Sequence, residues 1–326
     1  MKVLVTGAPG WLGTTLVRRL ARDSRDVRCL VLKGMDIKPL EEVGIKDLVF
    51  GDVRDKDSLK GLADGVNTVM HCAGVIHPPK VRDFDEINHQ GTRNMLAEAV
   101  RSGVRKFIQI SSNSAQGFNV DRETLMIETA QCRPESPYGR SKRAAEMAVM
   151  EHHGKNGMQT VILRPCMYFG PGMSHRMIRL LNMVKGGRPL VFGDGHHLRS
   201  LTYVPFLVDA IMLAEKKDEA NGEIFWIADK DAYSTIKIYE ALAQILGVKI
   251  KPRYLPAFLG KICEVIDVVS SRLGTYLEDF HIAGETIRNV GCDPKKSIDV
   301  LGMQPSFGIV EGYTAAIKWA KETGMI

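Results

Sequence analysis

The sequence predicts an α/β protein in which a doubly wound parallel sheet is joined to a smaller, mostly helical substrate-binding region. Three observations lead to this prediction. Runs of β-branched and aliphatic residues alternate with helical patterns as far as Pro165, a glycine-rich turn follows the first run, and the alternation becomes irregular afterwards. Because parallel strands need long crossover connections, strict strand-helix alternation favours a parallel sheet with helices on both faces.

The elements of the first half follow from local patterns. Strands are short apolar runs that end near Gly, Ser or Pro, and helices are longer segments whose apolar residues recur every three or four positions. The predicted strands are residues 2–7, 26–33, 45–53, 68–74, 106–112 and 159–165, and the predicted helices are 11–23, 58–65, 85–103 and 136–157.

The second half has a looser pattern that indicates a second region. We expect residues 1–168, with 202–229 returning to them, to form a dinucleotide-binding domain, and 169–201 with 230–326 to form the substrate-binding region. The elements expected after Pro165 are a loop and helix in 166–187, a β-hairpin over 190–204, a helix over 205–217, a strand over 223–229 and mostly helices from Lys230 onward.

One later segment has two interpretations. Residues 256–274 have the pattern of an amphipathic helix, which would either cover an apolar substrate as a lid or pack on its neighbours. Packing is the favoured interpretation.

Composition excludes several classes of protein. The net charge of +6 is mild for 326 residues and no basic block occurs, so nucleic-acid binding is not expected. No uncharged apolar run reaches the roughly 18 residues of a membrane span, and glycines and a proline interrupt residues 3–17, so we expect neither a membrane span nor a signal peptide but a cytoplasmic protein. No metal site is expected, because the six cysteines lack a ligand spacing: Cys29, Cys72, Cys132, Cys166, Cys263 and Cys292.

The glycine-rich turn predicts a dinucleotide site. It lies between the first strand and the first helix, where a glycine permits the tight turn, a second lets a pyrophosphate approach the backbone, and a third lets helix and strand pack closely. The amide groups and the positive end of the helix dipole then favour phosphate. The candidate cofactor-binding residues of this Rossmann-type turn are Gly7, Gly10, Trp11, Leu12 and Gly13.

Residues at the ends of the next strands bear on the choice of cofactor. Lys33 stands where an aspartate would bind the ribose of NAD, which leans the prediction toward NADP, although a solvent-exposed lysine is equally ordinary. Asp52, followed by Val53, lies where the adenine ring would rest. Small residues close the fourth strand and would let the backbone approach the cofactor: Cys72, Ala73 and Gly74.

Two segments place a tyrosine four residues before a lysine, which puts both side chains on one helix face. Tyr138 and Lys142 follow Ser112, which closes a predicted strand of the parallel series, and Pro137 suits a helix start. Tyr233 and Lys237 lack such a strand, and Ser234 or Thr235 is expected to cap the helix that follows. Chemistry is therefore predicted at the first pair.

The first pair suits proton transfer. A tyrosine acting as a base near neutral pH needs its pKa lowered by about three units, and a lysine ammonium together with a positive nicotinamide could supply most of this. Ser112 would hold the substrate oxygen. The predicted catalytic residues are Ser112, Tyr138 and Lys142.

These motifs together resemble the extended short-chain dehydrogenase/reductase superfamily, in particular its NAD(P)-dependent epimerase/dehydratase family. The resemblance rests on "TGAPGWLG", on "IQISSNSAQG" and on "SPYGRSKRAAE", and it continues to the end of the chain. It implies that Tyr138 is the base, that Lys142 binds the cofactor ribose, and that Asn88 and Pro165 lie on the cofactor side. A homodimer through the two long helices of the sheet domain is common in that family.

The resemblance also suggests substrate residues. Arg199, in "GDGHHLRSLTYV", matches an arginine that contacts a substrate diphosphate in sugar-nucleotide epimerases, although a solvent-facing arginine is an alternative. Met167 replaces a usual asparagine, and Pro205-Phe206 replace a usual polar pair, which makes the pocket less polar. The remaining candidates are Ser112, Asn113 and Ser114.

The sequence therefore predicts an NAD(P)-dependent epimerase of a nucleotide-activated sugar that acts through a transient keto intermediate. The alternative is an NADP-dependent dehydrogenase or reductase of a bulky apolar alcohol or ketone, of hydroxysteroid or flavonoid type. A non-catalytic dinucleotide-binding regulator is less favoured because the Ser-Tyr-Lys set is intact. Dehydratase chemistry is also less favoured, since Asn113 and Ser114 stand where an acidic pair would follow the serine.

Overall fold

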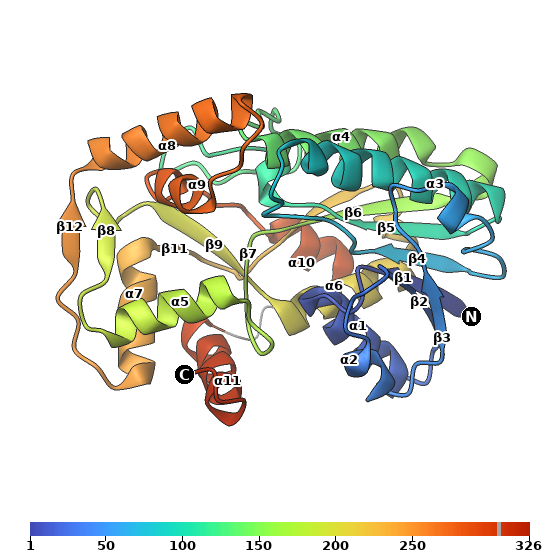
Figure 1. The fold of residues 1–326 in the computed structure, drawn as a ribbon, viewed down its shortest axis with the longest axis horizontal. Coiled ribbons are helices and arrows are strands. Elements are labelled where there is room, and N and C mark those ends of the chain that lie inside the picture. The colour runs from blue at the N-terminus through green and yellow to red at the C-terminus, as the bar shows by residue number, and fades with distance from the viewer. Residues whose placement is uncertain (305–307) are drawn as a thin grey trace.

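The computed structural model describes residues 1–304 and 308–326. Its centre is a seven-stranded parallel sheet in the order β10-β6-β5-β4-β1-β2-β3, as Figure 1 shows. The strands are β1 (Lys2–Thr6), β2 (Asp26–Val31), β3 (Asp47–Phe50), β4 (Thr68–His71), β5 (Lys106–Ile110), β6 (Gln159–Pro165) and β10 (Ile224–Ile227). The predicted doubly wound α/β fold is confirmed.

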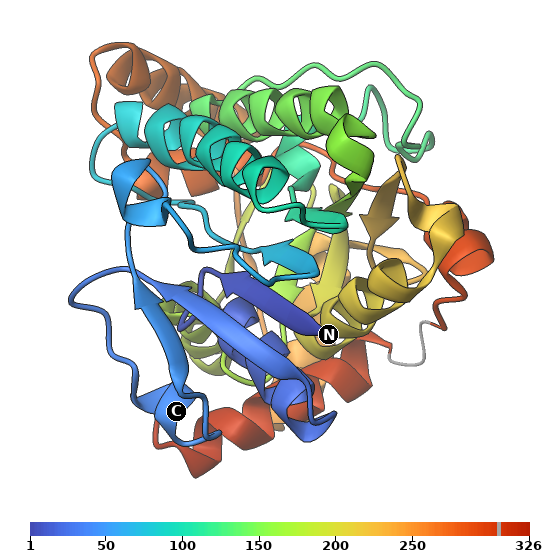
Figure 2. The same cartoon turned by 90° about the vertical axis from the view of Figure 1, so that its right-hand side faces the viewer.

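Helices cover both faces of this sheet. Figures 1 and 2 show α1 (Trp11–Arg22) and α6 (Val204–Lys216) on one face, and α3 (Gly91–Arg101) and α4 (Pro137–His152) on the other. Alternate residues of each strand serve the two cores, so in β1 the side chains of Val3 and Val5 pack with α1 whereas Leu4 packs with α3. This double burial explains why the strands have nearly continuous apolar sequences.

The strand order indicates where in the sheet the ligand-binding site lies. β1 pairs with both β2 and β4, so the chain leaves the sheet centre in opposite directions on its two sides. In such sheets the crevice beyond the carboxyl ends of the strands at this switch point is where ligands bind. The β1–α1 turn and the ends of β4 and β5 meet there.

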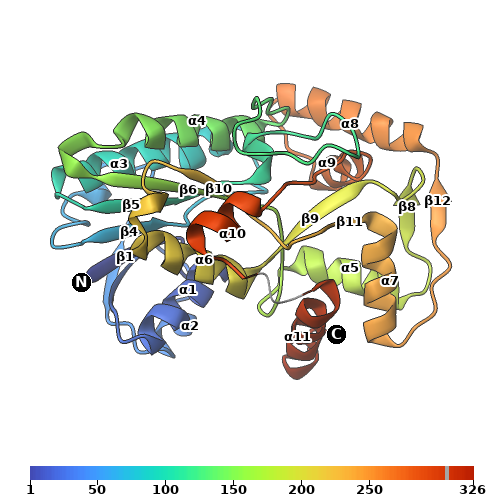
Figure 3. The same ribbon diagram turned by 180° about the vertical axis from the view of Figure 1, so that it is seen from behind.

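The remaining strands form two small sheets beside the main one. β9 (Leu198–Tyr203) lies between β7 (Met167–Phe169) and β11 (Ala232–Ser234), and β8 (Leu190–Phe192) pairs with β12 (Arg253–Leu255). The helices of this part are α5 (His175–Lys185), α7 (Thr235–Leu246), α8 (Ala257–Arg272), α9 (Glu278–Glu285) and α11 (Ile309–Glu322). Two further helices belong with the main sheet. α2 (Lys38–Glu41) follows β2, and α10 (Lys295–Leu301) lies beside β10 and α6, as the view from behind shows (Figure 3).

Two local predictions were wrong. The hairpin expected over residues 190–204 does not form, because β8 pairs in parallel with β12 and β9 pairs with β7 and β11. The turn between them instead binds the start of α7, where Ile236 N donates to the carbonyl of Gly195 at 3.0 Å. The helix expected over 58–65 is only a 3-10 turn over Asp57–Leu59, which ends before Gly61, a residue with φ of +81°.

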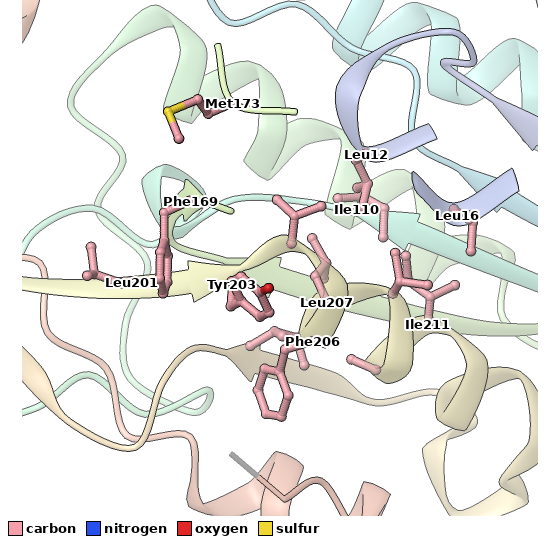
Figure 4. Packing of buried hydrophobic residues seen from close by; sticks show 14 of the residues in the cluster. Leu12, Leu16, Ile110, Phe169, Met173, Leu201, Tyr203, Phe206, Leu207 and Ile211 are labelled. Atoms are coloured by element: carbon pink, nitrogen blue, oxygen red, sulfur yellow. The ribbon is translucent and has the colours of Figure 1, made fainter. Parts of the chain in front are cut away.

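The core around α6 also contains Phe206. Its ring is 9% exposed and packs with Tyr203 and Leu207 under β9, as Figure 4 shows. The apolar residue at this position is therefore part of the packing between α6 and the small sheet. Pro205 packs next to Gly170, the residue after β7: its Cδ atom would lie 3.5 Å from a Cβ placed on Gly170.

A buried carboxyl group follows β10. Asp229 is 3% exposed, and its Oδ2 atom has no hydrogen-bond partner among the described residues. Burial, with a smaller contribution from the charge of Asp231, raises its pKa to about 8. The folded protein therefore binds a proton here that the unfolded chain releases near pH 4, so stability should fall as pH rises from about 4 to 8.

Asp229→Asn is expected to remove this penalty. The melting temperature of the variant should exceed that of the wild type by about 2–3 °C or more at pH 8, because a cost of at least 1–2 kcal/mol disappears. The advantage should shrink as pH falls toward 4. Asp231→Asn, at an exposed site two residues away, removes only the smaller contribution to this pKa and should show only a small part of the effect. Thermal unfolding of the three proteins between pH 4 and 8 measures these melting temperatures. A difference between Asp229→Asn and wild type that does not change with pH would contradict the raised pKa of Asp229.

No helix in residues 1–304 and 308–326 is long and apolar enough to cross a membrane. The same residues contain no group of three or more His, Cys, Asp or Glu side chains that could hold a metal ion.

Candidate active site

The glycine turn is closely packed against the end of β4. Gly7 has φ of +77°, and a Cβ on it would lie 2.7 Å from the backbone of Cys72 and Ala73. A Cβ on Gly10 or Gly13 would lie 2.8 or 2.5 Å from the carbonyl oxygen of Gly7. No side chain of the described residues caps the start of α1, so its first amides remain available to phosphate. The turn fits a dinucleotide pyrophosphate.

Gly10→Ala tests this fit. The added methyl group would overpack the turn by about 1–3 kcal/mol, and opening the turn to relieve it is expected to weaken dinucleotide binding about tenfold or more. Gly186→Ala is the control, because its Cβ would meet only ordinary contacts, the nearest at 3.4 Å. Calorimetric titration with NAD and NADP measures both. Unchanged affinity in the Gly10 variant would argue against the turn as the pyrophosphate site.

Trp11 and Leu12 hold the turn in place from inside. The indole Nε1 of Trp11 donates to the carbonyl of Pro171 at 2.7 Å, and its ring meets Tyr168 edge-on with centroids 6.0 Å apart. Leu12 is buried in the core below. Any contact of Leu12 with a cofactor would therefore come from its backbone.

The residues predicted to select the cofactor differ in their surroundings. Lys33 is exposed after β2. Asp52 is hydrogen-bonded to the guanidinium of Arg54 at 2.6 Å, which lowers the pKa of its carboxyl group. Val53 is buried against Gly91 at the start of α3. An adenine contact by Asp52 would have to share the carboxylate with Arg54.

The end of β4 meets the helix that carries Asn88. A Cβ on Gly74 would lie 2.9 Å from Asn88 Oδ1 and 3.8 Å from Lys142 Nζ. The Asn88 amide accepts from the backbone N of Val75 at 2.8 Å and donates to Ser141 Oγ at 3.1 Å. Asn88 lies in a π-helical turn over Phe84–Gln90. Cys72, Gly74, Asn88 and Lys142 are therefore brought together.

Ser112 and Tyr138 also come together. Ser136 caps α4 by accepting from the backbone N of Gly139 at 3.0 Å, and Gly139 packs closely on the carbonyl of Ser114. Through this contact the first turn of α4 packs against the 3-10 turn over Asn113–Ala115, which follows Ser112. Burial raises the pKa of Tyr138 to about 12, while a hydrogen bond with Ser112 acts in the opposite direction.

Lys142 lies one turn further along α4. Its Nζ donates to the carbonyl of Ile110 at 2.6 Å. Burial lowers its pKa to about 8, and the charge of Glu146 raises it. Without a cofactor, the chain's own residues raise the pKa of the Tyr138 phenol, because burial outweighs the hydrogen bond with Ser112 and the charge of Glu285 acts in the same direction as burial.

A buried network that was not predicted from the sequence lies behind Ser112, Tyr138 and Lys142. Arg164 and Glu146 are fully buried and joined by two hydrogen bonds of 2.7 Å. Glu146 also accepts from Ser111 Oγ at 2.6 Å, and Arg164 donates to Gln116 Oε1 at 2.7 Å. Glu146 stands eight residues after Tyr138, on the same helix face, so helical spacing contained a signal for it.

Arg199 has a different environment from the one expected. Its guanidinium is partly buried and donates to the backbone carbonyls of Leu198, at 2.8 Å, of Glu285, the last residue of α9, and of Arg288 beyond it. Burial lowers its pKa to about 10. To bind a diphosphate it would have to exchange some of these carbonyls. Met167, in β7, is half-buried.

A charged cluster that the sequence analysis missed lies nearby. His281 is 2.8 Å from Asp267 and 3.3 Å from Glu285. Burial alone would lower the pKa of His281, but these carboxylates raise it to about 10, and they hold a cation there at neutral pH. The charge of Glu285 also acts on Tyr138. The spacing of His281 and Glu285, four residues apart on a helix, was the available signal.

A cavity of about 410 Å³ lies between this cluster and the start of α4. Its walls include Ser136, the N-cap of α4, Pro137 of α4, Glu285 of α9, and Arg288. None of the predicted substrate residues lines it, although two of the carbonyls held by Arg199 belong to its walls.

The parallel doubly wound sheet and its glycine turn define the class of this protein: an enzyme of the extended short-chain dehydrogenase/reductase type. The chain belongs to the NAD dependent epimerase/dehydratase family, whose model matches residues 3–228.

Individual relatives cover most of the chain. It is 34% identical to the uncharacterized protein y4nL of Sinorhizobium fredii, over 99% of this chain and 96% of that protein. It is 30% identical to the UDP-glucose 4-epimerase of Vibrio cholerae, over 87% of this chain and 89% of that enzyme. The structure of MoeE5 in complex with UDP-glucuronic acid and NAD matches with a TM-score of 0.77 and 26% identity, covering 99% of this chain and all of that one.

Proposed function

We propose that this protein is an NAD(P)-dependent epimerase of a nucleotide-activated sugar. The observation that carries the proposal is that Ser112, at the carboxyl edge of the sheet, lies close enough to Tyr138 to lower the pKa of its phenol, with Lys142 one helical turn further along α4. The likeness to a UDP-glucose 4-epimerase over most of both chains supports an epimerase, and the complex of MoeE5 supports a nucleotide sugar and NAD.

Cofactor binding would fall to the glycine turn and the end of β4. The pyrophosphate would lie on the free amides of α1 beyond Gly10, and the nicotinamide ribose near Asn88 and Lys142. When bound, the nicotinamide would supply a reversible two-electron acceptor. The exposed Lys33 supports NADP, whereas the NAD in the complex of MoeE5 supports NAD. Calorimetric titration of the wild type with both dinucleotides distinguishes the two.

The chain's own residues would handle the proton. Ser112 Oγ would hydrogen-bond the substrate oxygen, and Tyr138 Oη would accept its proton and later return it. For this the phenol pKa must fall from about 12 toward neutral. The charge of Lys142, one helical turn along α4, and that of the bound cofactor would have to supply this lowering. Because the substrate is oxidised and reduced in one cycle, no cofactor would be consumed.

We also propose, from the family resemblance, a homodimer through α3 and α4. Met147 and Met150, on α4, are 50% and 47% exposed, which leaves apolar surface there for a partner.

The function is tested by offering UDP-glucose, UDP-glucuronic acid and a bulky apolar ketone with NAD(H) or NADP(H). Epimerised sugar, identified by nuclear magnetic resonance, with no net change in reduced-nicotinamide absorbance would support the proposal. Stoichiometric cofactor consumption with the ketone would instead establish the reductase alternative. Tight dinucleotide binding without any turnover would favour a regulator.

A further inference from the structure

Helix α8 has an apolar stripe on its outer face. Phe258, Ile262, Val265 and Val269 recur at intervals of four, three and four residues, and Leu273 continues the row after the helix ends. These five side chains, called here the α8 stripe, are between 48% and 80% exposed. Figure 1 shows α8 at the outer edge of the molecule, with α9 on its inner side. Solvent-facing helices normally carry polar side chains at such positions.

The opposite face of α8 is already occupied. A Cβ on Gly260 would lie 2.6 Å from the side chain of Ile287, and one on Gly284 of α9 would lie 3.0 Å from the backbone of Glu264, so the two helices pack closely. Asp267 is hydrogen-bonded to His281 at 2.8 Å. The helix therefore cannot turn its α8 stripe inward without breaking these contacts.

The charges of α8 are divided between its two faces. Its two acidic side chains both point inward, Glu264 to the guanidinium of Arg288 and Asp267 to His281.

The basic side chains of α8, Lys261 and Arg272, are exposed and border the α8 stripe by helical spacing. The chain that leads into the helix adds exposed Lys251, Arg253 and Tyr254. An apolar stripe edged only by positive charge is complementary to an anionic lipid surface.

We propose that α8 docks the protein on the surface of a bilayer that contains anionic phospholipid, with the helix axis parallel to the membrane plane. The α8 stripe enters the boundary between headgroups and acyl chains, while Lys261 and Arg272 contact lipid phosphate. Because residues of α8 also line the cavity beside α4, docking would hold that cavity close to the bilayer. The inference is independent of the substrate.

Vesicle flotation of the full chain tests it. Wild-type protein is expected to bind phosphatidylcholine vesicles that contain phosphatidylglycerol, to bind pure phosphatidylcholine weakly, and to lose binding as salt is added. Val265→Ser/Val269→Ser should bind about tenfold more weakly or worse. Its matched control is Val120→Ser/Val310→Ser, which changes two exposed valines outside α8. Lys261→Gln/Arg272→Gln should lose about fivefold in partitioning for each removed charge.

Other outcomes would overturn the proposal. Failure of wild type to float with anionic vesicles, or equal loss in the control pair, would exclude α8 as a membrane surface. Analytical sedimentation of each protein tests the alternative that a second copy of the chain covers the α8 stripe in a dimer. A dimer that dissociates in Val265→Ser/Val269→Ser but persists in the control, without vesicle binding by the wild type, would show that α8 is a subunit interface. Unchanged melting temperatures verify that the serine variants are folded.

Discussion

Tyr138→Phe is expected to reduce turnover by about a hundred- to ten-thousandfold, the range of a positioned acid-base group. The change removes only the phenol oxygen, whose pKa the neighbouring Ser112 lowers against the effect of burial. The ring remains in contact with Phe84, their centroids 5.8 Å apart, so packing and dinucleotide affinity should change little. Steady-state turnover of whichever substrate is identified, together with cofactor titration, measures the two effects separately.

The chain supplies a matched control in its other tyrosine-lysine pair. Tyr233 lies in β11, next to Ser234, whose side chain caps α7 as the sequence predicted. Tyr233→Phe is expected to leave turnover nearly unchanged. Full activity in Tyr138→Phe, or equal losses in both variants, would contradict the assignment of Tyr138 as the proton-transfer group.

Glu146→Gln is expected to destabilise the protein by about 3–5 kcal/mol, because it leaves the fully buried guanidinium of Arg164 without its counter-charge. The pair joins α4 to β6, and through Ser111 to the end of β5. Urea unfolding of the wild type, Glu146→Gln and Glu146→Gln/Arg164→Met measures this. The double variant should regain much of the loss, since no unpaired charge is left.

The same substitution gives a second readout. The charge of Glu146 raises the pKa of Lys142, so its removal should move that pKa below its value of about 8. If Lys142 must be protonated, the alkaline limb of the pH-rate profile should shift to lower pH. Glu151→Gln, at an exposed site on the same helix, should change neither property. Equal stability of Glu146→Gln and wild type would show that the ion pair has little structural importance.

Much of the candidate site follows from local patterns. Tyr138 and Lys142 were placed by helical spacing, and Pro137 and the serine-ended strand before them distinguished this pair from Tyr233 and Lys237. The same spacing, continued by four residues, reaches Glu146, which was not singled out from the sequence. Nothing local pointed to Arg164, because an arginine within an apolar strand is recognised as an ion-pair partner only when the facing helix is known.

Other features depended on partners distant in the chain. The pattern of residues 190–204 correctly indicated strands but not their pairing, since β8 joins β12 some 60 residues later. Arg199 was expected to reach a substrate diphosphate, yet in the structure its donors are directed to carbonyls after residue 284, a contact that no local pattern encodes. Whether it also contacts substrate stays a prediction.

The sequence by itself determined the parallel sheet, the dinucleotide turn and the tyrosine-lysine pair, because these depend on periodicity and on the conformational range of glycine and proline within short segments. Only the tertiary structure decided which side of α8 is covered, which carbonyls Arg199 holds, and what neutralises Glu146. Those outcomes depend on contacts between residues tens to hundreds of positions apart, whose free energies exist only once the chain has folded.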